Sequence, residues 1–455
     1  MSDAKKNDDL PIDQRRLAIA TVICGLAMAV MDGTIANLAL PSIARDMHAT
    51  AAESIWIINS YQIAMAICLL PLASLGEIVG YRRIYLIGLM MFTLASLACG
   101  SSNTIAQLSI ARVLQGFGAA GMLSVNIALI RFIYPADMLG RAVGYNALVA
   151  GSATALGPTV AGLILSVASW HWLFLINVPI GVVVLAIGYR SLPASPLAKH
   201  RYDVLSAMLC MASVGSLLYT VDAIGHLQGI FSILSCAILT VFVVALLLRF
   251  QPANAPMLPT DLLRIPLFSL SIGTSICSFA AQTAAYVMLP FYLQEHLGQS
   301  AAHAGLLLTA WPAAVAMTAL VAGKMSDRMS AGLLGGIGLA ILTLGLLSLL
   351  TVTAESADGL VAIRLAICGF GFGLFQSPNN RTMISVAPTL RSGAASGMLG
   401  TGRLMGQTAG ASLVAFALTA TSSPYIVILL IAAILSGAAC CVSLRRVGLS
   451  PTVPT

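Results

Sequence analysis

The sequence has few charged residues and lacks the motifs of soluble enzymes and ATP-driven pumps. Only 9% of its 455 residues are charged, whereas 58% are hydrophobic and the mean hydropathy is +0.94. Roughly a quarter of the residues of a soluble domain are charged, so this composition indicates a polytopic helical membrane protein. The chain contains no Gly-x-x-x-x-Gly-Lys-Ser/Thr phosphate loop and no nucleophile-base set, so neither ATP as the energy source nor enzymatic catalysis is expected.

The cysteines and the charge distribution exclude further classes. The nine cysteines have no metal-ligand spacing and nearly all lie in apolar stretches, which predicts buried thiols and no cofactor. The net charge is +7, but the basic residues occur singly or in pairs between apolar segments, which argues against nucleic-acid binding. Residues 1–16 lack the apolar core of a signal peptide, so the first hydrophobic segment is expected to remain as a helix.

The apolar runs predict the number of membrane spans and their orientation. A hydrocarbon core about 30 Å thick needs about 20 helical residues, and this length divides the chain into fourteen segments between residues 17 and 444. On this map 19 of the 23 Lys and Arg residues fall on the side of the two termini, and only Arg45 falls on the other side. Such a bias predicts that both termini are cytoplasmic.

An internal repeat indicates two related halves. The motif Gln-Gly-Phe-Gly at residues 115–118 recurs as Cys-Gly-Phe-Gly at 368–371, and Asn126 recurs at the same offset as Asn379. Parallel repeats of this kind place a substrate site at their interface near the bilayer midplane. The predicted organisation is a cytoplasmic tail (1–16), a six-helix bundle (17–190), a linker with two additional transmembrane helices (191–265), a second six-helix bundle (266–444) and a cytoplasmic tail (445–455).

Asp32 is the one acidic residue that this reading places inside a long apolar run. A lone carboxylate at membrane depth costs a few kcal/mol or more unless it is protonated or paired. Arg112, Gln115 and Gly116 share a helical face that can carry a guanidinium towards it. Two hypotheses remain open: a permanent structural ion pair, or a pair in which a proton or a substrate cation competes for the carboxylate.

The motifs resemble those of the major facilitator superfamily, in its fourteen-helix drug:proton antiporter family and its YebQ-like branch. The resemblance covers essentially the whole chain. It is carried by the phrases at residues 31–41, 73–83, 112–118, 151–162 and 170–179. It implies an all-α major facilitator fold of two six-helix bundles plus two extra helices, with Asp32 and Arg112 as the proton-coupling residues.

The resemblance also implies residues that control conformational change. Glu77 stands where the loop signature usually has Asp. Small residues on one stripe of the fifth segment let another helix approach closely. The resemblance further implies a bend in this segment that shapes the transport route. The residues concerned are Glu77, Gly80, Arg82, Arg83, Gly151, Gly157, Pro158 and Gly162.

Polar and aromatic residues on the central segments are the candidates for substrate binding. An amide in a membrane helix is about as often an interhelical contact as a ligand contact. Together with 19 methionines, this mixture suits an amphipathic organic guest. The candidates are Asn59, Tyr61, Gln62, Gln115, Asn126, Asn146, Gln282, Tyr286, Trp311, Phe372, Gln376 and Asn379.

The sequence therefore predicts a monomeric, multi-pass transporter in the lipid bilayer of a bacterial inner membrane. The favoured function is proton-coupled multidrug efflux of small amphipathic, cationic organic compounds, with antibiotic resistance as a consequence. A proton-coupled transporter of one specific metabolite is the alternative, and a membrane enzyme or sensor is a more distant one. His226 and Asp222 are expected at the non-cytoplasmic surface, with His226 simply solvated.

Overall fold

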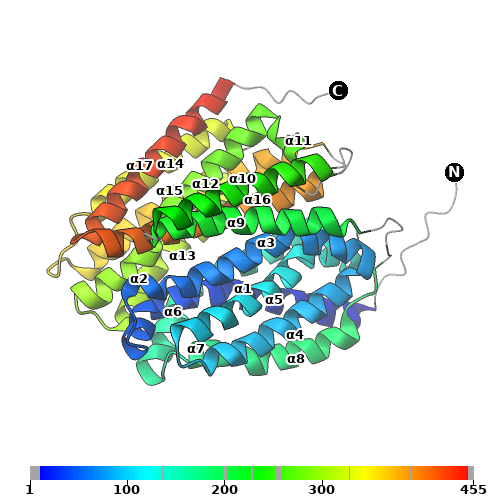
Figure 1. Ribbon diagram of the computed structural model, residues 1–455, viewed down its shortest axis with the longest axis horizontal. Helices are drawn as coiled ribbons and strands as arrows, with labels where there is room; N and C mark the ends of the chain where they lie inside the picture. The colour runs from blue at the N-terminus through cyan, green and yellow to red at the C-terminus, as the bar shows by residue number, and fades with distance from the viewer. Residues whose placement is uncertain are drawn as a thin grey trace.

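The computed structural model describes residues 11–135, 138–195, 197, 202–226, 229–251, 258–326, 328–388 and 391–448. These residues form a bundle of long helices that run side by side (Figure 1). A backbone surrounded by lipid has no water to bond to, so its amides must be satisfied within helices or a closed barrel. The long apolar runs of this chain form helices.

The described part of the first half contains six long helices and two short ones. They are α1 (Ile12–Asp46), α2 (Ala51–Ser54), α3 (Trp56–Val79), α4 (Tyr81–Gly100), α5 (Ile105–Ile133), α6 (Leu139–Val167), α7 (Trp172–Leu175) and α8 (Asn177–Ser191). The structure then continues with α9 (Val204–Gly225), α10 (Ile230–Phe250) and the short α11 (Thr260–Leu263).

The second half also contains six long helices. They are α12 (Pro266–Phe291), which continues into the π-helix η1 (Tyr292–His296), α13 (Ala301–Met325), α14 (Ala331–Leu349), α15 (Asp358–Ser385), α16 (Ser392–Ala420) and α17 (Pro424–Arg445), which ends in the 3-10 turn η3 (Arg446–Gly448).

The number of long helices agrees with the sequence prediction. Thirteen helical stretches among the described residues are long and apolar enough to cross a membrane. The remaining long helix, α16, has 29 residues but is less apolar, because it carries Arg403 and Gln407 among many small residues. The predicted all-α membrane fold is confirmed.

The described ends of the chain lie at the same end of the bundle. In Figure 1 the start of α1 lies at the right and α17 runs from the left up to the top, so both ends lie at the upper-right end of the helices. We call this the terminus end. The opposite end, which carries the short helices α2 and α7, is called the far end.

The internal repeat has a packing equivalent in both halves. A Cβ at Gly118 of α5 would lie 2.7 Å from the backbone oxygen of Gly88 in α4, and a Cβ at Gly371 of α15 would lie 2.5 Å from that of Gly338 in α14. Glycine at these positions lets two helix backbones touch. The repeated motif therefore builds the same helix crossing twice.

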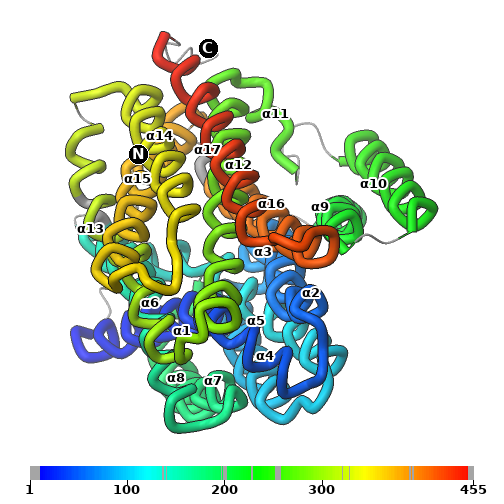
Figure 2. Tube along the Cα trace, turned by 90° about the vertical axis from the view of Figure 1, so that its left-hand side faces the viewer, coloured from blue at the N-terminus to red at the C-terminus, as the bar shows by residue number. Residues whose placement is uncertain are grey.

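The two additional helices differ in their surroundings. α9 packs against α3 of the first half and α16 of the second half, so it lies along the seam between them. α10 packs on α9 and lies at the edge of the molecule (Figure 2). Its exposed side chains include Phe231, Ile238 and Val241, which suits a face towards lipid. The helix pair is thus joined to the bundle through α9.

We expect the close glycine crossings to be the sites of the fold most sensitive to added volume. Gly118→Ala and Gly371→Ala each force a methyl group into backbone atoms of the neighbouring helix, and overpacking of this kind costs roughly 1–3 kcal/mol. Gly437→Ala on α17 is the matched control, since a Cβ there meets nothing within 4 Å. Thermal unfolding of the purified variants in detergent measures the difference. Equal melting temperatures for all three would contradict this account of the crossings.

Candidate functional site

Asp32 and Arg112 form a buried ion pair between α1 and α5. Both side chains are 1% exposed, and the Arg112 guanidinium donates to the Asp32 Oδ2. The other carboxylate oxygen accepts from the Gln115 amide at 2.8 Å and from the Asn177 amide at 3.1 Å. Every carboxylate oxygen therefore has a donor, which offsets the cost of burying the charge.

The guanidinium of Arg112 is held from other directions too. Its Nε donates to the backbone oxygen of Ile57 at 3.1 Å, and Nη1 also donates to the Gln115 Oε1 at 2.6 Å. The ring of Tyr61 lies 4.1 Å from the guanidinium carbon, close enough for a cation–π contact. These contacts fix the arginine in one orientation beside Asp32.

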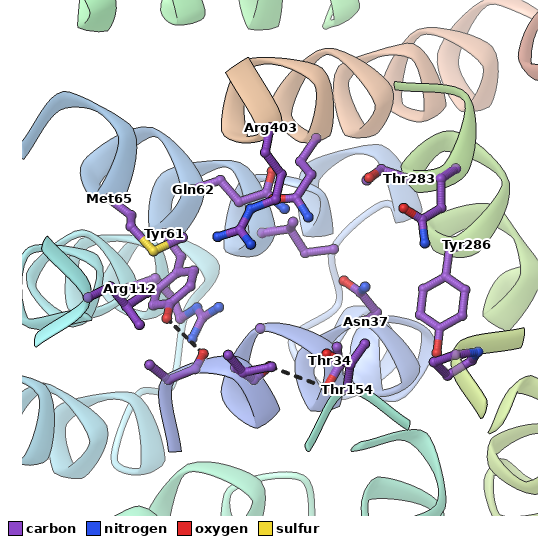
Figure 3. Close-up of a pocket in the computed structure, with 18 of the residues that line it drawn as sticks. Thr34, Asn37, Tyr61, Gln62, Met65, Arg112, Thr154, Thr283, Tyr286 and Arg403 are labelled. Carbon is purple, nitrogen blue, oxygen red and sulfur yellow. Dashed lines mark hydrogen bonds between the residues drawn. The ribbon is translucent and has the colours of Figure 1, made fainter. Parts of the chain in front are cut away.

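A cavity of about 170 Å³ lies next to this pair, between the two halves (Figure 3). Its walls come from α1, α3, α5 and α6 of the first half and from α12, α13 and α16 of the second. Arg112 lines the cavity, whereas Asp32 lies behind it. A change in the ion pair would thus alter the charge at the cavity wall.

Five of the twelve predicted substrate-binding residues line this cavity: Tyr61, Gln62, Gln282, Tyr286 and Trp311. The Gln62 Oε1, the Tyr286 hydroxyl and the Trp311 Nε1 are buried and have no hydrogen-bond partner among the described residues. The Tyr286 and Trp311 rings meet edge to face at 6.1 Å. This wall offers an aromatic surface together with unused polar atoms.

The other seven predicted residues do not line the cavity: Asn59, Gln115, Asn126, Asn146, Phe372, Gln376 and Asn379. Gln115 instead orients the ion pair, and Phe372 packs against Phe279 with ring centroids 5.1 Å apart. Asn379 donates to Ser275 at 2.8 Å and accepts from Arg446 at 2.7 Å. These three join helices within one half of the protein.

Sequence reasoning did not select several residues that line the cavity. They are Thr34, Asn37, Met65, Thr154, Thr283, Arg403 and Gln407. Arg403 lies inside the predicted segment 391–420, one helical turn from Gln407. An arginine in the middle of a membrane segment was the available signal, because such residues usually face the interior of a bundle.

The small residues of α6 allow close contact with both halves. A Cβ at Gly157 would lie 2.0 Å from the Thr34 Oγ1 of α1, and one at Gly162 would lie 2.9 Å from the Ala302 Cα of α13. A Cβ at Gly305 of α13 would lie 2.4 Å from the Pro158 backbone oxygen. Gly151 faces Ala316 more loosely, at 3.7 Å. The stripe therefore has the close packing that the sequence suggested.

The predicted loop signature lies at the terminus end. Gly80 caps α3 with φ of 105°, a conformation that favours glycine. Arg82 donates to the backbone oxygen of Tyr189 in α8. Glu77 and Arg83 are exposed. Arg82 therefore bonds to a helix of its own half in this structure.

Asp222 is not at the surface, as the sequence analysis supposed, but fully buried near the far end of α9. Its Oδ1 accepts from Asn59 of α3 and, at 3.1 Å, from Ser412 of α16. Its Oδ2 lies 3.2 Å from the Nδ1 of His226. The interpretation of His226 as simply solvated was also wrong, because α9 lies against two other helices at this point rather than at the edge of the bundle.

Comparison with known proteins places this geometry in a family. The chain matches the Major Facilitator Superfamily over residues 22–411 and again over residues 270–454. The D-xylose-proton symporter structure superposes with a TM-score of 0.69 at 12% identity, covering 97% of this chain and 99% of that one, which shows the shared fold.

Relatives at higher identity extend over nearly the whole chain. The uncharacterized transporter YebQ of Escherichia coli (strain K12) is 50% identical over 97% of both chains. The multidrug resistance protein Stp of Mycobacterium tuberculosis is 32% identical, covering 88% of this chain and 76% of Stp. The riboflavin transporter RibZ of Clostridioides difficile (strain 630) is 27% identical over 85% of each. The chain thus belongs to the major facilitator superfamily, whose members are transporters rather than enzymes, and it resembles YebQ.

Proposed function

We propose that the protein is a proton-coupled secondary active transporter that exports amphipathic organic compounds by alternating access. One observation supports this above the others: Arg112 both pairs with the buried Asp32 and forms part of the cavity wall. Protonation of Asp32 would weaken its bond to Arg112 and leave an additional positive charge facing the cavity. Proton binding and substrate binding would then be linked through a single side chain.

Alternating access requires two halves that can separate at either end. At the far end, Gln294 after α12 donates to the Leu38 backbone oxygen of α1 at 3.0 Å, and the Thr159 and Thr309 hydroxyls of α6 and α13 lie 2.6 Å apart. These few contacts between the halves can be broken without unfolding either bundle. The cavity between the halves would then open towards that end.

The cavity wall supports an amphipathic substrate. Tyr61, Tyr286 and Trp311 offer aromatic surface, and Met65 offers an adaptable one. The names of relatives include a multidrug resistance protein and a tetracenomycin C resistance and export protein, which agree with export of such compounds. The cationic preference inferred from Asp32 would require the substrate to compete with Arg112 for the carboxylate.

Proton-coupled transport of one specific metabolite is the second candidate. It is favoured by the relative that carries the name of a riboflavin transporter, which aligns with 85% of this chain. A transporter of this kind would share the ion pair and the cavity, and it would differ in accepting a narrow range of compounds. Counterflow assays with a chemically varied panel separate the two.

The proposal places the protein in the inner membrane of a bacterium with the terminus end in the cytoplasm. We expect Ser422→Cys, exposed between α16 and α17, to react with a membrane-impermeant maleimide in intact cells. Arg328→Cys, exposed between α13 and α14, should react only after the cells are permeabilised. Both variants need Cys441→Ser, since Cys441 is the cysteine that lies exposed. The reverse labelling pattern would invert the proposed orientation.

Asp32→Asn tests the coupling directly. One proton that crosses a membrane potential of about 100 mV supplies ~2.3 kcal/mol, which sustains roughly a 40-fold substrate gradient. We expect proteoliposomes with the original protein to reach a gradient of this order after a pH step of about 1.7 units, which stores the same free energy, and those with Asp32→Asn to reach none. Accumulation by correctly folded Asp32→Asn protein would leave the ion pair with a structural role only.

Two controls separate loss of coupling from loss of folding. Asp13→Asn makes the same chemical change on an exposed part of α1 and should leave transport unchanged. Removing one partner of a buried pair costs about 3–5 kcal/mol. The double variant Asp32→Asn/Arg112→Gln removes both charges, so it should recover part of the thermal stability that Asp32→Asn loses, and it should still fail to couple.

A further inference from the structure

The cavity carries an arginine whose charge has no partner in the described part of the chain. Among the described residues, the cavity lining contains two guanidinium groups, Arg112 and Arg403, and no acidic side chain. Arg112 is paired with Asp32 behind the wall. Arg403 forms no salt bridge or hydrogen bond with any described residue, and its Nε is buried without a partner. The wall therefore has one unbalanced positive charge.

The backbone of α16 fixes where this charge lies. A Cβ at Gly406 would lie 2.5 Å from the Ile276 backbone oxygen, and one at Gly410 would lie 2.5 Å from that of Ala280. This face of α16 is thus packed directly on α12. Arg403 lies about one turn before Gly406 and extends into the cavity towards Gln62 and Tyr61 (Figure 3).

The surroundings of Arg403 can bind an anion. A guanidinium in a desolvated site is costly unless it is paired, and its planar donors match a carboxylate, sulfonate or phosphate. The amides of Gln62 and Gln407 line the same cavity and can donate further hydrogen bonds. Tyr286 lies across the cavity from Arg403 (Figure 3), and the Trp311 ring that meets it also lines the cavity. The apolar body of the same molecule would rest against these two rings.

We propose that Arg403 binds an acidic group of the substrate, so that the transported compounds are amphipathic organic anions or zwitterions. This inference rests on the proposed function and identifies its substrate class. It also changes the expected charge, because the acid that suggested a cation is already bonded to Arg112, Gln115 and Asn177. Export of an anion would further be assisted by a membrane potential that is negative inside.

Matched pairs of ligands test the proposal on the purified full-length protein. We would measure the binding of 2-naphthoate, 2-naphthalenesulfonate and 2-naphthamide by calorimetry in lipid nanodiscs. The original protein should bind the two acids roughly 10- to 100-fold more tightly than the amide, as expected for a charge-assisted hydrogen bond. Arg403→Gln should remove this preference and leave amide binding within about twofold, and Arg403→Lys should retain part of it.

Arg131→Gln, at an exposed arginine outside the cavity, is the control and should leave the preference unchanged. The proposal is wrong if the acids bind no more tightly than the amide, if they do not bind, or if Arg403→Gln retains the preference. These outcomes are independent of coupling. Proton-driven export of a cationic compound that is unaffected by Arg403→Gln would support transport and contradict the anion site. If Arg403→Gln loses the preference for acids but the original protein fails the pH-step assay, the result would support the anion site and contradict proton-driven transport.

A second inference comes from the buried cluster around Asp222. Asn59 of α3 donates to Asp222 and, at 3.1 Å, to Ser412 of α16, so one group of side chains joins α9 to both halves at the far end. Gly225 lets α9 touch α16, since a Cβ there would lie 2.4 Å from the Ser412 backbone oxygen. Separation of the halves at this end must break these bonds.

His226 makes this cluster sensitive to protons. Its Nδ1 lies 3.1 Å from the Asp222 backbone oxygen and 3.2 Å from the Asp222 Oδ2, and its Nε2 lies 3.2 Å from the Ala52 backbone oxygen. Both nitrogens face acceptors, and only the imidazolium can donate from both. Burial lowers the pKa of His226, and the hydrogen bonds and charge of Asp222 outweigh it, so that the pKa lies above its ordinary value of 6.5. The other charged group nearby is Glu53 of α2, and Trp56 and Tyr219 complete the surroundings.

We infer that the Asp222–His226 cluster is a proton-sensitive clasp that holds the far end closed. Because the pKa of His226 is raised when the clasp is formed, the stabilisation is fully present below the ordinary value of 6.5. It is lost as the pH rises through the raised value. Acid on the far side would therefore favour closure at that end, which is the direction that a proton-driven exporter needs.

Distance measurements between spin labels test the clasp. Labels at Asn103 and Ser422, exposed far-end positions in the first and second halves, should report a larger closed population at pH 6 than at pH 8.5. His226→Gln should abolish this pH dependence, and Asp222→Asn should lower the closed population at both pH values. His303→Gln removes an exposed His–Asp pair at the same end and should change nothing. A pH dependence that persists in His226→Gln, or that is absent from the original protein, would overturn the clasp.

Discussion

The structure depends on how one buried charge is satisfied in an apolar bundle. Asp32 can remain ionised at membrane depth only because Arg112, Gln115 and Asn177 surround it with donors. These partners come from α5 and α8, so the requirement determines how three helices of the first half meet. Arg112 also lines the cavity, so the ion pair and the cavity share one side chain.

Close helix contacts provide the geometry in which this pair can act. Glycines at equivalent positions in α5 and α15 build one crossing in each half, and the stripe on α6 brings the two halves together. Contacts between small residues are tight but involve few strong bonds, so a whole bundle can separate from its neighbour as a unit. A fully bonded charged network inside one half, with close packing and few hydrogen bonds between the halves, is a suitable combination for alternating access.

Much of the fold could be predicted from the sequence. Long apolar runs predict the helices, because a lipid-exposed backbone must bond its amides within a helix or a closed barrel. The alternation of loops with and without basic residues supports the predicted number of helices. The pairing of Asp32 with Arg112 could also be anticipated, since an isolated membrane carboxylate needs a partner. The repeat at residues 115–118 and 368–371 was recognisable because both copies need glycine where one helix backbone touches the next.

The remaining site residues required three-dimensional information. Asn59 and Asp222 lie 163 positions apart in the chain, and no periodicity shows that α9 fills the seam where they meet. An amide such as Asn379 has the same sequence signature whether it bonds to a neighbouring helix or faces a cavity. Arg403 could be located in a membrane segment, but the absence of acidic residues around it becomes evident only when seven helices are assembled.

The exchange of protons with the solvent on substrate binding is the most direct test of the central claim that Asp32 and the cavity are linked. Purified protein in a weakly buffered solution with a pH indicator, near neutral pH, should exchange protons with the solvent when a transported compound is added. Asp32→Asn protein should bind the compound without any exchange. Equal proton exchange by the two proteins, with binding confirmed for both, would show that the linkage resides elsewhere.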